Sequence, residues 1–146
     1  KYLIEQCQAN VEAKNDYRRT PLHIASSNGH IETVKYLIEQ CHANVEAKDS
    51  SGNTPLHCAS AKGYIEIVKY LFEHCHVNVE AKSYGGWTPL HIASSNGYIE
   101  TVKYLIEQCH ANADAKDNFG MTPVQCASTN NRITVAGYLM QINRHF

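Results

Sequence analysis

The sequence predicts an all-α protein, a solenoid of stacked helix-turn-helix units with short β-hairpin fingers between them. The main observation is an internal repeat: TPLHIASSNG at residues 20–29 returns unchanged at 88–97, and TPLHCASAKG stands between them at 54–63. Each Thr-Pro pair lies 34 positions from the next. A unit of this length cannot bury its apolar faces alone, so such repeats stack into a row with one continuous core.

Two helices are predicted in every unit. In the first unit Thr20 is a favourable N-cap, Pro21 fits the first helical turn, and Gly29 suits the left-handed residue that ends a helix. A second helix begins near Ile31, where apolar residues recur at helical spacing opposite charged ones. The stretch ANVEAKDSSGN at 43–53 has turn composition and predicts a hairpin-like finger.

We expect one array over residues 1–146. Residues 1–14 match 35–48, so the chain opens with half a repeat, beginning with a lone helix from Lys1 to about Gln6, and looks like a fragment. In the last unit Gly137 is expected to interrupt the second helix, and the end is polar, which predicts a cap. The units are a partial repeat at 1–14, repeats at 15–48, 49–82 and 83–116, and a C-terminal capping repeat at 117–146.

Composition limits the kinds of partner. The net charge is −1 and both signs are spread along the chain, which leaves no basic face for nucleic-acid phosphates. No apolar run reaches the roughly 18 residues that a membrane span needs. We therefore expect a monomer that binds another protein, without nucleic acid and without membrane insertion.

The six cysteines predict neither a metal site nor a disulfide. Cys41, Cys75 and Cys109 hold the same position in successive units, and helices packed side by side lie about 8–10 Å apart. That spacing is too wide for a disulfide or for one zinc ligand set. Cys58 and Cys126 stand where other units have isoleucine, so we expect them in the core. Six free thiols favour an intracellular, cytoplasmic location.

The stretch TPLHIASSNGHIETVKYLIEQ, followed by ANVEAKDSSGNTPLH, resembles the ankyrin repeat family over essentially the whole chain. The resemblance implies a curved solenoid whose fingers and first helices line a concave, partner-binding surface. The period is 34 residues, against about 33 in the family. The extra residue falls in Gln40–Ala43, where the family has one glycine, and we expect a one-residue extension there. Arg18 stands where the other turns have glycine.

The resemblance implies a structural role for His23, His57 and His91, which in the family hydrogen-bond within and between the turns. A catalytic role is the alternative, because histidine titrates near neutral pH and serves as a general base. No nucleophile, carboxylate pair or phosphate loop accompanies them, so we expect no enzymatic activity and no cofactor. Gln125 offers a similar amide in the last unit. Tyrosines that repeat in register on the second helices are interpreted as structural.

Residues that differ between units are the candidates for partner binding, because residues that build the stack must be alike. The four turns read NDYRRT, DSSGNT, SYGGWT and DNFGMT. Aromatic and arginine side chains are the usual anchors of interfaces. The predicted partner-binding residues are Tyr17, Arg19, Tyr84, Trp87, Phe119 and Met121, with Trp87 at the centre. A second variable set late in the first helices is Ser27-Asn28, Ala61-Lys62, Ser95-Asn96 and Thr129-Asn130.

Two interpretations of these residues stay open. The finger aromatics could instead pack against adjacent fingers. At the level of function, the first possibility is a non-enzymatic protein-protein interaction module that acts through the fingers and the concave face of the first helices. The second is a targeting or spacer array of a larger multidomain protein whose activity lies outside this fragment.

Overall fold

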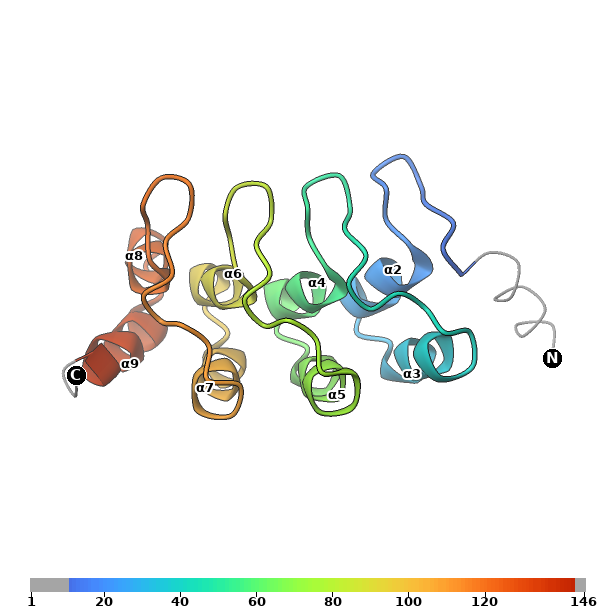
Figure 1. The fold of residues 1–146 in the computed structure, drawn as a ribbon. Helices are drawn as coiled ribbons and strands as arrows, with labels where there is room; N and C mark the ends of the chain where they lie inside the picture. Colours follow the sequence, from blue (N-terminus) through green and yellow to red (C-terminus); the bar gives the residue numbers. More distant parts are fainter. Residues whose placement is uncertain (1–10, 144–146) are drawn as a thin grey trace.

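Figure 1 shows the computed structural model of the chain, in which residues 11–143 are described. The helices of that part form helix-turn-helix pairs, so the predicted all-α solenoid is confirmed. The lone helix predicted from Lys1 lies outside the described residues. The pairs are α2 (Pro21–Ser27) with α3 (Ile31–Glu39), α4 (Pro55–Lys62) with α5 (Ile65–Cys75), α6 (Pro89–Asn96) with α7 (Ile99–Glu107), and α8 (Pro123–Thr129) with α9 (Ile133–Asn143).

The pairs stand side by side in a single row (Figure 1). The first helices α2, α4, α6 and α8 form one layer, and the second helices α3, α5, α7 and α9 form the other. Apolar side chains at equivalent positions fill the space between the layers, so each pair completes the core of its neighbour. The fully buried leucines of this core are Leu22, Leu56, Leu71, Leu90, Leu105 and Leu139.

The turns that connect successive pairs project on the side of the first helices (Figure 1). We call residues 15–20, 49–54, 83–88 and 117–122 fingers 1 to 4. No residue between 11 and 143 belongs to a β-strand, so the predicted β-hairpins are corrected to hairpin-shaped turns. Neighbouring fingers share a backbone hydrogen bond, such as the Ser50 N–H to the Tyr17 carbonyl at 2.8 Å. A strand ladder needs a regular series of such bonds.

The same cap begins α2, α4 and α6. The Thr20 Oγ1 accepts the His23 N–H at 3.3 Å, and the His23 Nδ1 accepts the Thr20 N–H at 3.1 Å. In α8 the histidine is replaced, and the Gln125 Oε1 accepts the Thr122 N–H at 2.9 Å. The predicted N-caps and the role expected of Gln125 are confirmed.

The extra residue of each repeat lies directly after the second helix. First helices close in the common way: the His30 N–H bonds to the Ala25 carbonyl, five positions back, at 3.1 Å. Second helices close one residue later, because the Ala43 N–H bonds to the Leu37 carbonyl, six positions back, at 3.0 Å. His42, which lies between Leu37 and Ala43, has a left-handed backbone conformation with a φ angle of 57°. The same closure follows α5 and α7, which confirms the expected one-residue extension.

Gly137 does not interrupt the last helix. The α9 helix runs from Ile133 to Asn143 without a break, so this expectation was wrong. Glycine in a helix interior costs about 1 kcal/mol relative to alanine. Burial of Val135 and Leu139 on either side of it offsets that cost.

Four of the cysteines are free thiols, namely Cys58, Cys75, Cys109 and Cys126. Burial raises the pKa of Cys109 to about 12 and that of Cys126 to about 11, so both are protonated at neutral pH. Cys41 is disulfide-bonded, but to none of the other cysteines between residues 11 and 143. The prediction of six free thiols is wrong at this position. The helix spacing of about 8–10 Å excludes a disulfide only between cysteines of the stacked, described repeats, and no other cysteine of those repeats pairs with Cys41.

Candidate partner-binding surface

The first residue of every finger fixes the shape of the loop with its side chain. In finger 2 the Asp49 Oδ1 accepts the N–H groups of Ser51 and Asn53, both at 2.9 Å. Such bonds hold a turn without the help of a strand. The sequence reasoning missed this set, although Asn, Asp, Ser and Asp recur there at the repeat interval. The equivalent bonds run from Tyr17 and Arg19 to Asn15, from Trp87 to Ser83, and from Phe119 and Met121 to Asp117.

The fourth residue of every finger has left-handed backbone geometry. The φ angle is 81° at Gly52, 85° at Gly86 and 78° at Gly120, and Arg18 adopts 59° in finger 1. The Arg18 turn therefore has the same geometry as the glycine turns, at a cost of roughly 1 kcal/mol for a residue with a Cβ. A Cβ at Gly52 would lie only 2.8 Å from the backbone nitrogen of Tyr84 in finger 3. Neighbouring fingers therefore pack with their backbones close together.

A histidine ladder ties each first helix to the next finger. The His57 side chain is 0% exposed, and its Nε2 lies 2.8 Å from the Trp87 carbonyl oxygen. Its Nδ1 accepts the Thr54 N–H at 3.0 Å, so Nε2 carries the proton and donates. His23 and His91 make equivalent bonds to the carbonyls of Asn53 and Met121, at 2.8 and 2.9 Å. The structural role that the family resemblance implied is confirmed.

Burial lowers the pKa of His23, His57 and His91, and their bonds to backbone carbonyls only partly oppose that shift. The three rings are therefore neutral at physiological pH. Both nitrogens of each ring are engaged within the array, and the rings do not face solvent. Their arrangement stabilises the stack of repeats and presents no base to a bound molecule.

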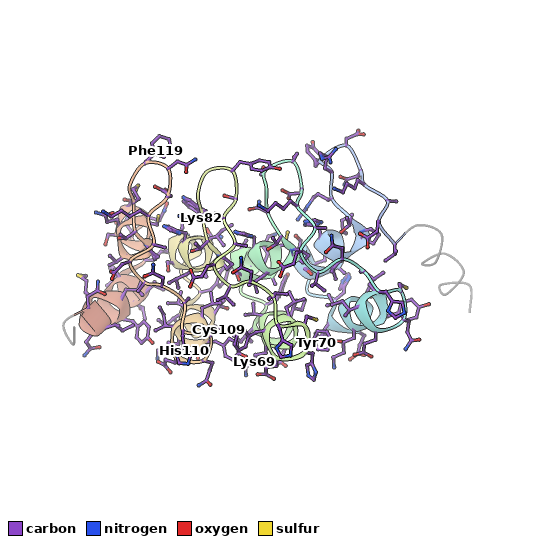
Figure 2. All side chains as sticks on the ribbon, viewed as in Figure 1. Lys69, Tyr70, Lys82, Cys109, His110 and Phe119 are labelled. Carbon is purple, nitrogen blue, oxygen red and sulfur yellow. The ribbon has the colours of Figure 1, made fainter. Side chains whose placement is uncertain are left out.

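Three of the six predicted residues lie at the finger tips and face solvent. The exposed fraction is 69% for Tyr17, 65% for Tyr84 and 89% for Phe119. Figure 2 shows Phe119 at the end of finger 4, pointing away from the helices. The ammonium of Lys48 lies 6.0 Å from the centre of the Tyr84 ring, and Gly52 of finger 2 packs against the same ring. The tips therefore form a row of aromatic groups that the fold itself does not bury.

The other three lie at the finger bases and contact the array. The half-buried Trp87 donates its indole Nε1–H to the Asp117 Oδ2 at 2.8 Å, and its ring stacks on His91 at 6.0 Å between centroids. Burial alone would raise the pKa of the Asp117 carboxyl, but the Met121 N–H and the indole N–H lower it to below its ordinary value. Trp87 therefore links finger 3 to finger 4, which agrees with the alternative that finger aromatics pack against adjacent fingers.

Arg19 and Met121 are also half-buried at the bases. The Arg19 guanidinium donates to Ser27 and to the Cys58 Sγ, the latter at 3.1 Å, and its Nε lies 3.7 Å from Asp49 Oδ2. The sequence set thus divides into a tip group and a base group. Position within the finger, rather than residue type, separates the two.

The second predicted set, late in the first helices, also divides. The Asn96 side chain donates to the Ala61 carbonyl at 2.8 Å, and the Asn130 side chain donates to the Ser95 Oγ at 2.8 Å. These bonds connect neighbouring first helices. Asn28, Lys62 and Thr129 are exposed beside them and remain candidates for contact with a partner.

A tyrosine ladder joins the repeats on the opposite layer. The Tyr104 hydroxyl donates to the Glu73 Oε2 at 2.8 Å, and the Lys69 ammonium lies 5.8 Å from the centre of the Tyr104 ring. Figure 2 places Lys69 and Tyr70 on this second-helix layer, away from the fingers. Burial and the glutamate bond raise the pKa of the tyrosine hydroxyl. The structural interpretation of these tyrosines is confirmed. The equivalent donors are Tyr70 to Glu39 and Tyr138 to Glu107.

Helix pairs in one row, a capping box at each first helix and histidine bonds between neighbours define a helical repeat protein of the solenoid class. A family model described as ankyrin repeats (3 copies) matches residues 1–83 and again residues 75–145. The chain belongs to the ankyrin repeat family, whose members are typically non-enzymatic modules for protein-protein interaction. No curated protein matches it. None of the helices between residues 11 and 143 has the length and apolar character to cross a bilayer.

Proposed function

We propose that this chain is a non-enzymatic protein-protein interaction module that binds its partner through the finger tips, with the concave face of the first helices beside them. The observation that carries the proposal is the exposure of three aromatic side chains, Tyr17, Tyr84 and Phe119, at the tips. Large apolar groups held in water are costly in a monomer, and aromatic residues anchor interfaces. Burial of these side chains against a partner therefore stabilises the complex.

The base group supports the tips in this proposal. Arg19, Trp87 and Met121 border the tip residues, and each is half-buried against the array. Hydrogen bonds that Asp49 and Asp117 accept from backbone N–H groups fix the loops in the unbound chain. A preformed surface loses less conformational entropy on binding than a flexible loop does. Trp87, expected to be the central anchor, contributes the exposed part of its ring and keeps fingers 3 and 4 together.

The test is an affinity capture that compares variants of the chain. The tip variant carries Tyr17→Ser, Tyr84→Ser and Phe119→Ser. The control variant carries Glu32→Ser, Glu66→Ser and Glu100→Ser, three exposed positions on the second helices. Circular dichroism establishes that both fold. Proteins captured by each are compared quantitatively with those captured by the unchanged chain.

We expect a protein that the unchanged chain and the control variant retain equally and the tip variant loses. With that protein purified, each tip substitution should weaken binding by about 2 kcal/mol or roughly thirtyfold, the effect of truncating an interface anchor. If the tip variant captures the same proteins as the unchanged chain, the fingers are not the binding surface.

A further inference from the structure

The last second helix differs from the others in charge. The α3 helix carries Glu32, Lys35 and Glu39, and α5 and α7 have glutamate, lysine and glutamate at the equivalent positions. The α9 helix, ITVAGYLMQIN, has no charged residue. Charged residues are depleted from the cores of interfaces, whereas a helix that meets only water normally carries them. The composition of α9 is that of a helix covered on more than one side.

An apolar face of α9 nevertheless lies open to solvent. Ile133 is 82% exposed and Met140 is 50% exposed. The isoleucines that open the three earlier second helices are half-buried, because a following repeat packs beside each of them. Here the two side chains border an open hollow of about 320 Å³ that Ala136 and Gly137 also line. The charged residue on its rim, Arg132, donates through Nε to the Ser95 carbonyl at 3.0 Å.

Gly137 stands in the middle of this face. A Cβ added there would meet no atom within 4 Å, so the packing of the chain leaves room for alanine. Alanine would also favour the helix by about 1 kcal/mol. The fold of one copy therefore gives no reason for glycine at this position. A glycine between two apolar side chains allows the backbone of another helix to approach closely.

Another repeat of the same kind does not fit this face well. In the earlier repeats a lysine and a glutamate, such as Lys69 and Glu73, hold the tyrosine of the following repeat. Gly137 and Gln141 occupy these two positions in α9. The groups that would receive a following tyrosine are therefore missing, while the apolar side chains remain.

We propose that the apolar α9 face, made of Ile133, Ala136, Gly137 and Met140, binds the same face of a second copy of this chain. A two-fold axis beside Gly137 brings the two glycines together and sets Ile133 of each copy near Met140 of the other. An uncharged face with its small residue at the centre is complementary to itself, as a two-fold interface requires. In such a dimer the α9 helix of the second copy packs beside α9, on the side away from α7, and continues the row of second helices. The proposal replaces the monomer expected from the sequence, and the finger surface plays no part in it.

Sedimentation velocity on residues 1–146, in reducing buffer and over a wide range of protein concentration, tests the proposal. We expect the mass to rise from that of one chain to that of two. Gly137→Lys restores the lysine of the other repeats and sets two like charges against each other, so it should weaken self-association by about tenfold or more. Thr134→Lys is the matched control, because it adds the same charge to an exposed position of α9 outside the apolar face.

Gly137→Ala separates association from folding. It should raise the melting temperature of the single chain, since alanine favours the helix, and yet weaken dimerisation, since the methyl group keeps the helices apart. A chain that stays monomeric at every concentration overturns the proposal. So does a dimer that Gly137→Lys and Thr134→Lys weaken equally, because self-association would then use another surface.

Discussion

The histidine ladder and the tyrosine ladder join the same repeats in the same register, but they end on different kinds of group. His57 is buried and bonds to a backbone carbonyl, whereas the Tyr104 hydroxyl meets a glutamate carboxylate at the surface. When a buried donor is removed, its carbonyl loses its partner and water cannot replace it. When a surface hydroxyl is removed, water takes its place. The two ladders look alike, and burial decides how much each stabilises the array.

The largest expected effect is that of His57→Ala. It leaves the Trp87 carbonyl and the Thr54 N–H without their partners and opens a cavity in the layer of first helices. We expect the free energy of unfolding to fall by about 3 kcal/mol, measured by urea denaturation. His57→Gln is the matched control, because Gln125 already accepts the N–H of its cap threonine in α8, and it should cost less. If His57→Ala lowers the free energy of unfolding by less than about 1 kcal/mol, the histidine ladder is not a main source of stability.

The same ladder makes stability depend on pH. The pKa of His23, His57 and His91 is lower in the folded chain than the ordinary value of 6.5. The unfolded chain therefore binds protons first as the pH falls. Stability is complete above pH 6.5 and decreases from there towards the folded pKa values. Urea denaturation at a series of pH values between about 8 and about 5 measures this slope. The chain with all three residues changed to glutamine should give a much flatter curve, and an equal slope would contradict the assignment.

An intermediate effect is expected from comparing a finger base with a finger tip. Trp87→Ala removes the indole bond to Asp117 and the contact with His91, and should lower the free energy of unfolding by about 2 kcal/mol. Phe119→Ser changes a side chain that is 89% exposed, so the free energy of unfolding should change by less than about 0.5 kcal/mol. Thermal denaturation of the two variants measures both values. Equal losses would show that tips and bases are not separate groups.

The smallest effect is expected from Tyr104→Phe. Only the bond from the hydroxyl to Glu73 is lost, and the ring stays under the Lys69 ammonium. We expect a loss of about 0.5 kcal/mol in urea denaturation, since surface bonds of this kind contribute little. Tyr104→Phe in a chain that already carries Glu73→Gln isolates the pair. A loss close to that of His57→Ala would show that exposure does not separate the two ladders.

The sequence predicted the features that repeat at a fixed interval. The helix starts at Thr20 and its copies and the extension before Ala43 were expected, because each follows from a local pattern seen several times. The bonds of His57 were expected because the family resemblance implied them. The division of the fingers was not predicted. Variation between units marked Trp87 and Phe119 alike, and the Asp117 that holds Trp87 belongs to the next repeat, 30 positions away. Only the register of the stack shows which variable side chain has such a neighbour.

Two further expectations failed where local rules met tertiary contacts. Glycine lowers helix propensity, but the buried residues around Gly137 keep α9 continuous. Turn composition predicted hairpins, but side chains such as Asp49 hold the fingers without strands. In both cases the sequence predicted the position of the element correctly. The expected break in α9 and the expected strands of the fingers were wrong, because helix propensity and turn composition do not describe contacts with the rest of the fold.

The short reach of the bonds between repeats has a consequence for folding kinetics. The His57 bond spans 30 positions, the Tyr104 bond 31 and the Asn96 bond 35. Each such bond closes a loop of about one repeat, so the entropy lost on closure stays nearly constant however long the array becomes. Folding can start at any neighbouring pair of repeats and spread outwards, and proteins with such local contacts fold quickly. The same property lets an end repeat unfold while the middle of the row stays native, so hydrogen exchange should be slowest in α4 to α6 and fastest towards the two ends.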